Sequence, residues 1–252
     1  MGFGYSTHGL PYRDTLIYMV GGRGNAVMAF AQADGKVRWK ALDDANSPSS
    51  PILINVDGQQ QIVGVFSDYI VGFSPNGGRE FWRHPHREPN CSCNISTPIW
   101  APGNILFVGT AYGLGARALE IHQTAEKSTV KELWSNRRLQ LHFGSAILKD
   151  GYIYVSVGHD GPALMTAVEL KTGTVKYQDR GLSKAQLVYA DGKFFMTDQQ
   201  GMIALGRGTP EKFTVLSQFE GLKNISWTAP TIAGTKMYVR DRLILTAYDV
   251  GK

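Results

Sequence analysis

Short apolar runs alternate with polar turns along the whole chain. The clearest unit is AFAQADGKVRW (29–39), in which an apolar strand end enters a turn at Gly35 and a second strand then carries Trp39. The same arrangement returns as GFSPNGGREFW (72–82) and AVELKTGTVKY (167–177), each with an aromatic residue four positions after a glycine. The tryptophans that end the first two units lie 43 residues apart. A period of this size, built on hairpins, predicts a repeat architecture.

Each repeat is predicted to contain four short strands. The first strand is an apolar run led by Ser, Thr or Pro, as in SSPILI (49–54). A tight turn follows, and Asp57-Gly58, Asp150-Gly151 and Asp191-Gly192 are typical cases. Asp-Gly between two alternating apolar runs is a strong hairpin signal. The second strands, such as 152–157, are rich in β-branched and aromatic residues, which favour strands.

Six copies of this unit fill the 252 residues, at 42 residues per copy. Four-stranded units of about 40–50 residues are the blades of β-propellers. The sequence therefore predicts an all-β fold and a single domain over 1–252: a β-propeller of about six four-stranded blades around a central channel. Closing the sheets into a ring would also remove exposed strand edges.

Two places depart from the regular unit. The segment 123–131 is predicted to add a helical turn to the third copy. The sixth copy has only four residues after Tyr248, so its fourth strand is missing. Three explanations stay open: Met1–Ser6 supplies the strand, a partner chain pairs with the edge and allows self-association, or the chain is a fragment of a longer propeller.

Composition and charge exclude several classes of function. The formal net charge is +5 but the basic residues are scattered, so no nucleic-acid partner is predicted. No apolar stretch reaches the ~18 residues of a membrane span. The first five residues, MGFGY, hold neither a basic nor an apolar region of a signal peptide. The two cysteines, Cys91 and Cys93, form no disulfide framework.

The segments KTGTVKY (171–177) and ADGKVRW (33–39) resemble the PQQ-like (quinoprotein) β-propeller repeat, and the likeness extends over nearly the whole chain. The chain is similar to BamB-like proteins, which are propeller lipoproteins of outer-membrane protein assembly, and to PQQ-dependent alcohol dehydrogenases. This resemblance implies a periplasmic or exported location. Quinoprotein dehydrogenases carry adjacent cysteines over the cofactor, whereas Ser92 separates Cys91 from Cys93 here. We therefore expect no PQQ and no quinone redox chemistry.

Candidate chemistry gathers in the predicted links and second-to-third turns, which share one face of a propeller. Five of the six histidines are predicted on that face, and only His122 on the other. The densest cluster holds His84, His86, Cys91 and Cys93, whose imidazoles and thiolates would suit Zn²⁺. The alternative is that these are loop residues with the thiols packed as small apolar groups.

Two further sets of residues are candidates on the same face. His142, His159 and Asp160 could perform acid–base work, although Ser145 matches the Ser/Thr of every first strand and is read as a repeat residue. The predicted ligand-binding residues are Asp68, Arg137, Arg138 and Arg240. The alternative is that these arginines are solvent-exposed charges in turns that bind no ligand.

Three functions remain in order of preference. The first is a binding or scaffolding module that takes a protein or small-molecule ligand at the channel face, with no cofactor. The second is a metal-dependent hydrolase for an ester, lactone or phosphoester, with zinc at the channel mouth. The third is a PQQ-dependent alcohol dehydrogenase.

Overall fold

The computed structural model describes residues 6–87, 93–159, 163–180, 182 and 184–251. Within these residues the regular structure consists of 23 strands in six antiparallel sheets, with no helix, which confirms the all-β prediction. No helix that could cross a membrane therefore occurs in this part of the chain. Two compact units, Met1–Arg138 and Leu139–Lys252, each contain three sheets. That residues 1–252 form a single domain stays a prediction.

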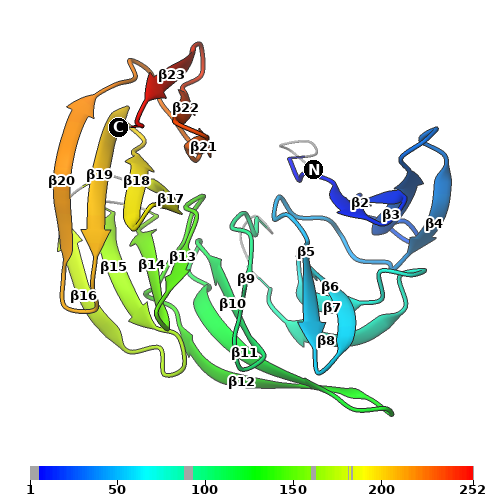
Figure 1. The fold of residues 1–252 in the computed structure, drawn as a ribbon. Helices are drawn as coiled ribbons and strands as arrows, with labels where there is room; N and C mark the ends of the chain where they lie inside the picture. The colour runs from blue at the N-terminus through cyan, green and yellow to red at the C-terminus, as the bar shows by residue number, and fades with distance from the viewer. Residues whose placement is uncertain (1–5, 88–92, 160–162, 181, 183, 252) are drawn as a thin grey trace. The chain divides into compact units, whose positions relative to one another are not determined.

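The first unit holds three four-stranded sheets in which consecutive strands are neighbours (Figure 1). Their strands are β1 (Leu10–Tyr12), β2 (Thr15–Met19), β3 (Val27–Ala31) and β4 (Val37–Ala41), then β5 (Ile52–Val56), β6 (Gln59–Val65), β7 (Tyr69–Phe73) and β8 (Glu80–Pro85), then β9 (Ile99–Ala101), β10 (Ile105–Thr110), β11 (Gly115–Gln123) and β12 (Ser128–Asn136).

The second unit holds two four-stranded sheets and one of three strands. Their strands are β13 (Ile147–Lys149), β14 (Tyr152–Val157), β15 (Leu164–Glu169) and β16 (Val175–Arg180), then β17 (Gln186–Ala190), β18 (Lys193–Thr197), β19 (Met202–Gly208) and β20 (Phe213–Glu220), then β21 (Thr231–Ala233), β22 (Lys236–Arg240) and β23 (Leu245–Asp249).

The first hairpin of each sheet turns on residues with positive φ. Asp57, Asp150 and Asp191 have φ values of 48°, 51° and 48°, and each is followed by a glycine with positive φ. These are the conformations that tight hairpin turns require, and Asp and Gly adopt them at low cost. The sequence reading missed the hairpin between β1 and β2, because Arg13 (φ 53°) takes the place of the aspartate there.

A β-bulge interrupts the pairing of the third and fourth strands in all five four-stranded sheets. In four of them the repeat aromatic lies directly opposite a small residue beside the bulge. These pairs are Trp39 with Ala29, Trp82 with Gly72, Trp134 with Ala118, and Tyr177 with Ala167. A β-carbon on Gly72 would lie only 2.1 Å from Trp82, so the small residue makes room for the ring. An aromatic residue four positions after a glycine in the sequence therefore indicates a bulge.

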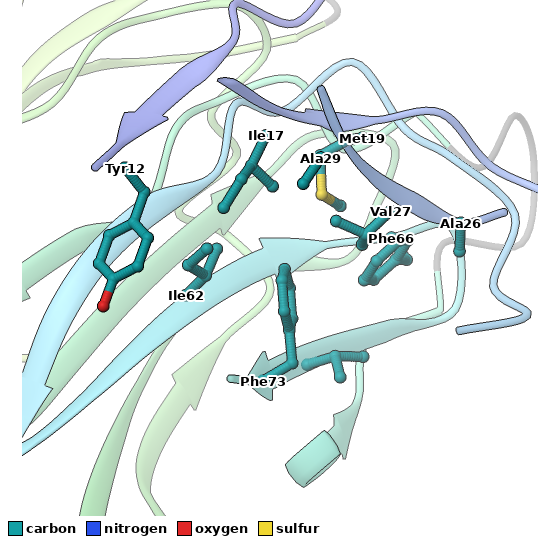
Figure 2. Close-up of a cluster of buried hydrophobic side chains, with 10 residues drawn as sticks. Tyr12, Ile17, Met19, Ala26, Val27, Ala29, Ile62, Phe66 and Phe73 are labelled. Carbon is teal, nitrogen blue, oxygen red and sulfur yellow. The ribbon is translucent and has the colours of Figure 1, made fainter. Parts of the chain in front are cut away.

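The core lies in layers between successive sheets of each unit. Figure 2 shows one such layer, where Ile17, Met19 and Val27 of the first sheet meet Ile62, Phe66 and Phe73, contributed by β6, the residue following it and β7. All six of these side chains are fully buried, with at most 1% of their surface exposed. Residues alternate along β2 and β3 between buried and half-buried, so the period-two pattern of the sequence becomes this layer.

Two sequence expectations have definite outcomes. The helical turn over 123–131 is wrong, because β11 and β12 extend as one long hairpin closed by Thr124, whose N–H donates to the Lys127 carbonyl at 2.9 Å. Among the described residues the last sheet has three strands, as its sequence predicted. The proposed closing segment Met1–Ser6 lies outside the described residues except for Ser6.

Candidate functional site

His84 lies at the end of strand β8 and not in a link, which corrects its predicted position. Its Nε2 is 3.2 Å from Glu132 Oε2 and 3.1 Å from Arg117 Nη1, and Arg117 Nη1 also donates to Glu132 at 2.9 Å. Burial and the neighbouring Arg117 guanidinium lower the pKa of His84. The imidazole is thus engaged in a half-buried polar cluster between β8, β11 and β12.

His86 follows β8 and is buried in the first unit. Its Nε2 is 3.0 Å from Thr110 Oγ1, and Thr110 Oγ1 donates to Asn94 Oδ1 at 2.8 Å. Because the threonine proton goes to Asn94, His86 Nε2 carries the proton of this bond, and Nδ1 is the bare nitrogen. Burial, with Arg117 adding to it, lowers the pKa of His86 to about 3. This histidine is neutral at physiological pH.

The described residues include only part of the predicted zinc cluster. Cys91 lies outside the described residues, and Cys93 is buried. His84 and His86 turn their Nε2 atoms to different partners, Glu132 with Arg117 and Thr110 respectively. No group of three or more His, Cys, Asp or Glu side chains suited to a metal occurs among the described residues.

The structure brings together His142 and His159 of the second unit, as the acid–base prediction requires. Their ring centroids are 4.7 Å apart in an edge-on arrangement. The third member of that set, Asp160, lies outside the described residues. Ser145 donates to the Leu187 carbonyl and accepts the Leu187 N–H, both at 2.8 Å, so its hydroxyl links two neighbouring sheets. Ser49 donates to the Ser96 carbonyl in the same way, which supports the reading of Ser145 as a repeat residue.

An aromatic cluster continues from the two histidines. The Phe143 ring is 4.8 Å from His142 and 5.1 Å from Trp227, and the Arg242 guanidinium lies 5.0 Å from the Trp227 ring centre. Trp227 is 51% exposed, and its indole N–H donates to Gln199 Oε1 at 3.1 Å. The cluster thus presents a large aromatic surface to solvent.

Asp241 holds together the two loops that carry this surface. One carboxylate oxygen accepts the backbone N–H groups of Leu243 and Ile244 at 2.8 Å, and the other accepts the backbone and side-chain N–H of Asn224 at 3.1 Å. These hydrogen bonds lower the pKa of Asp241 to about 2. The carboxylate is therefore ionised over the physiological range.

Large apolar side chains are exposed on both loops. Ile225 is 42% exposed, Leu243 79% and Ile244 53%. Together with Phe143, Trp227 and Arg242, these residues form a surface that we call the loop face. The sequence analysis did not single out this surface. Only Trp39 and Trp82 follow a glycine by four residues, so the lack of that spacing does not distinguish Trp227 from Trp100 and Trp134.

The predicted ligand-binding residues fall in different units. Asp68, Arg137 and Arg138 belong to the first unit, and Arg240 to the second. Asp68 is 3.5 Å from the exposed Arg87 guanidinium, and its carbonyl accepts the His86 N–H. Arg240 is exposed at the end of β22, directly before Asp241.

Solved structures identify the fold class. The chain matches the computationally designed protein Ika8 with a TM-score of 0.66 at 12% identity, covering 92% of this chain and 67% of that one. It matches the β-propeller domain of Cps50 (Swd1) from Myceliophteria thermophila with a TM-score of 0.62 at 10% identity, covering 97% and 84%. A europium-containing methanol dehydrogenase gives 0.61 at 8% identity, covering 96% and 66%. These likenesses show that the chain has the β-propeller fold.

The family follows from the sequence itself. The family model of the outer membrane protein assembly factor BamB matches residues 7–179, so the chain belongs to that family. A search of curated proteins gave no match. A PQQ-like repeat propeller of this family is consistent with a binding or scaffolding module.

Proposed function

We propose that this protein is a binding module that holds a segment of another protein on the loop face. The observation that carries the proposal is the exposed Trp227, Ile225, Leu243 and Ile244 on two loops joined by Asp241. Contiguous exposed apolar side chains of this size mark interaction surfaces. Tryptophan and arginine, paired here as Trp227 and Arg242, dominate the energetics of many interfaces.

The loop face is fixed before a partner arrives. Asp241 accepts four hydrogen bonds from the two loops, and Ser226 donates to the Arg240 carbonyl at 2.8 Å. Gln199 fixes the orientation of the Trp227 indole. A surface whose side chains and loops are already ordered loses less conformational entropy on binding.

The charges around the loop face indicate the chemistry of the partner. Arg240, Arg242 and Lys223 are exposed on the two loops, and the nearby Asp241 uses its carboxylate internally. A segment with apolar or aromatic side chains next to acidic residues would complement this surface. Family membership supports a partner in outer-membrane protein assembly, and with it a location outside the cytoplasm.

Site-specific photo-crosslinking in living cells tests the proposal. A photoreactive amino acid at Leu243, the most exposed residue of the loop face, should give a discrete crosslinked protein identified by mass spectrometry as a component of outer-membrane assembly. Trp227→Ala in the same protein should reduce the crosslink several-fold, because it removes the aromatic centre of the surface.

The matched control is the photoreactive amino acid at Leu216. This residue is similarly apolar and 47% exposed, but it lies on β20 outside the loop face. Equal crosslinking from positions 243 and 216, or a crosslink at 243 that Trp227→Ala leaves unchanged, would rule out the loop face as the binding surface.

A second candidate function rests on the 4.7 Å approach of His142 and His159. With Asp160, these residues could perform acid–base work in an ester, lactone or phosphoester hydrolase that uses zinc. The test is zinc content and esterase or phosphoesterase activity of the untagged protein. Activity that zinc restores, and that His142→Ala with His159→Ala abolishes, would favour the hydrolase over the binding module.

Three predictions about ligands and partners accompany the proposal. Ligand binding by Asp68, Arg137, Arg138 and Arg240 and metal binding by His84, His86, Cys91 and Cys93 stay hypotheses that single Ala variants and the zinc assay address. Self-association through the last sheet is tested by solution mass, since β23, an edge strand among the described residues, can accept a further strand on its open side.

A further inference from the structure

A cleft of about 310 Å³ opens in the first unit, on a surface distinct from the loop face. Its walls come from the β1–β2 hairpin, the start of β4 and the turn between β7 and β8. The lining residues used below are Tyr12, Arg13, Asp14, Arg38, Trp39 and Pro75. This volume is at the lower end of small-molecule sites.

Arg13 holds a strained backbone conformation at the mouth of the cleft. Its φ of 53° lies in the left-handed region, at the hairpin position where three other sheets carry Asp57, Asp150 and Asp191. Aspartate tolerates this region, whereas a long side chain there is uncommon. Within the described part of the chain Arg13 forms no ion pair, and its guanidinium lies 5.3 Å from the Tyr12 ring centre. Strain of this kind clusters at ligand sites.

Arg38 is directed to the cleft by the bulge in the first sheet. Val37 pairs with Phe30 and Trp39 with Ala29, so Arg38 is the extra, unpaired residue of β4. Bulges re-aim side chains in this way. Its Nη2 is 3.8 Å from Asp14 Oδ2, and both side chains are more than half exposed. An exposed ion pair of this kind contributes little to stability, so an incoming anion can take the place of the Asp14 carboxylate beside Arg38.

Three rings, those of Tyr12, Trp39 and Pro75, line the cleft beside the polar residues Thr15 and Asn76. Trp39 packs against Gly78, where a β-carbon would lie 2.9 Å from its Cζ3. Tyr12 is buried and its hydroxyl donates to Gln60 at 3.0 Å, while Pro75 is buried as well. These rigid side chains offer a flat apolar wall beside two guanidinium groups.

From this geometry we infer that the cleft binds a small aromatic carboxylate. The carboxylate lies between Arg13 and Arg38, because the planar guanidinium fork matches a carboxylate. The aromatic ring of the ligand lies along Trp39 and Pro75. The Asp14 carboxylate disfavours ligands with a second negative charge next to the ring.

Ligand titration of the full chain tests the inference, with N-acetyl-L-phenylalanine as the probe and its neutral amide as the matched control. A ligand of this size is expected to bind with a dissociation constant of roughly a millimolar, measured by calorimetry or saturation-transfer NMR. The amide should bind at least about tenfold more weakly, as should Arg38→Gln with the acid, since each change removes one charge-assisted hydrogen bond. Arg207→Gln, an exposed arginine of the second unit, makes the same change in net charge and should leave the affinity unchanged.

Arg13→Gly separates loss of the site from loss of the fold. Glycine fits the φ of 53° without strain, so this variant should melt roughly 2–4 °C higher while binding the probe about tenfold more weakly. Equal affinity for acid and amide, no detectable binding of the acid, or equal effects of Arg38→Gln and Arg207→Gln would each overturn the inference.

Discussion

Replacing His86 by glutamine should flatten the pH dependence of stability. The pKa of His86 is lowered to about 3 in the folded protein by burial, while an unfolded histidine titrates near 6.5. Between these values the unfolded chain binds the proton and the folded chain does not. Stability is therefore fully present above pH 6.5 and falls by about 1.36 kcal/mol per pH unit as the pH drops toward 3. From pH 7 to pH 4.5 this amounts to about 2–3 kcal/mol.

Urea unfolding at the two pH values measures this quantity directly. His84 and Asp44, whose pKa values are also shifted, titrate in wild type and variant alike, so the comparison isolates His86. The His86→Gln variant should lose about 2–3 kcal/mol less than wild type on acidification, even if it is less stable at pH 7. His8→Gln, which removes an exposed histidine, is the matched control. If wild type and His86→Gln lose the same free energy, His86 is not a buried neutral histidine.

Two further predictions concern the bulge of the second sheet. Gly72→Ala places a methyl group 2.1 Å from the Trp82 ring and should lower the free energy of unfolding in urea by about 1–3 kcal/mol. An unchanged urea midpoint would mean that the ring moves freely. Trp82→Phe removes the indole N–H that donates to the buried Gln61 Oε1 at 2.7 Å and should cost about 1–3 kcal/mol, whereas a loss below about 0.5 kcal/mol would show that water replaces the donor.

The hairpins could be predicted from the sequence because their signals are local. Asp-Gly at 57–58, 150–151 and 191–192 fixes turn geometry within two residues, and the alternation beside it fixes which side chains are buried. The β1–β2 hairpin was missed because Arg13 replaces the turn residue. The helical turn at 123–131 was wrong because β11 and β12 pair along their whole length, and pairing between strands overrides a weak local preference.

The candidate site was predictable only in part. His142 and His159 flank one sheet, so the strand order alone placed them on one face. The contact of Phe143 with Trp227 joins residues 84 positions apart, and no local pattern reports it. The lowered pKa of His86 likewise depends on burial and on Arg117, which belongs to the next sheet. Ring contacts and buried neutral side chains of this kind depend on which residues of neighbouring sheets meet. The repeat period alone does not specify those contacts.

In a repeat fold, the residues that break the repeat deserve more functional weight than those that keep it. Ser49 and Ser145 keep it, and their hydroxyls join neighbouring sheets. Arg13 breaks it by replacing a turn aspartate at a cost in backbone strain, and Trp227 breaks it by lying exposed in a loop, whereas Trp39, Trp82 and Trp134 lie in strands beside the bulges. Neither residue improves the packing of its sheet, since both are exposed. Local departures that lower or leave unchanged the stability of a fold are expected at functional sites. The two exposed surfaces proposed here, the loop face and the cleft, are each centred on one such departure.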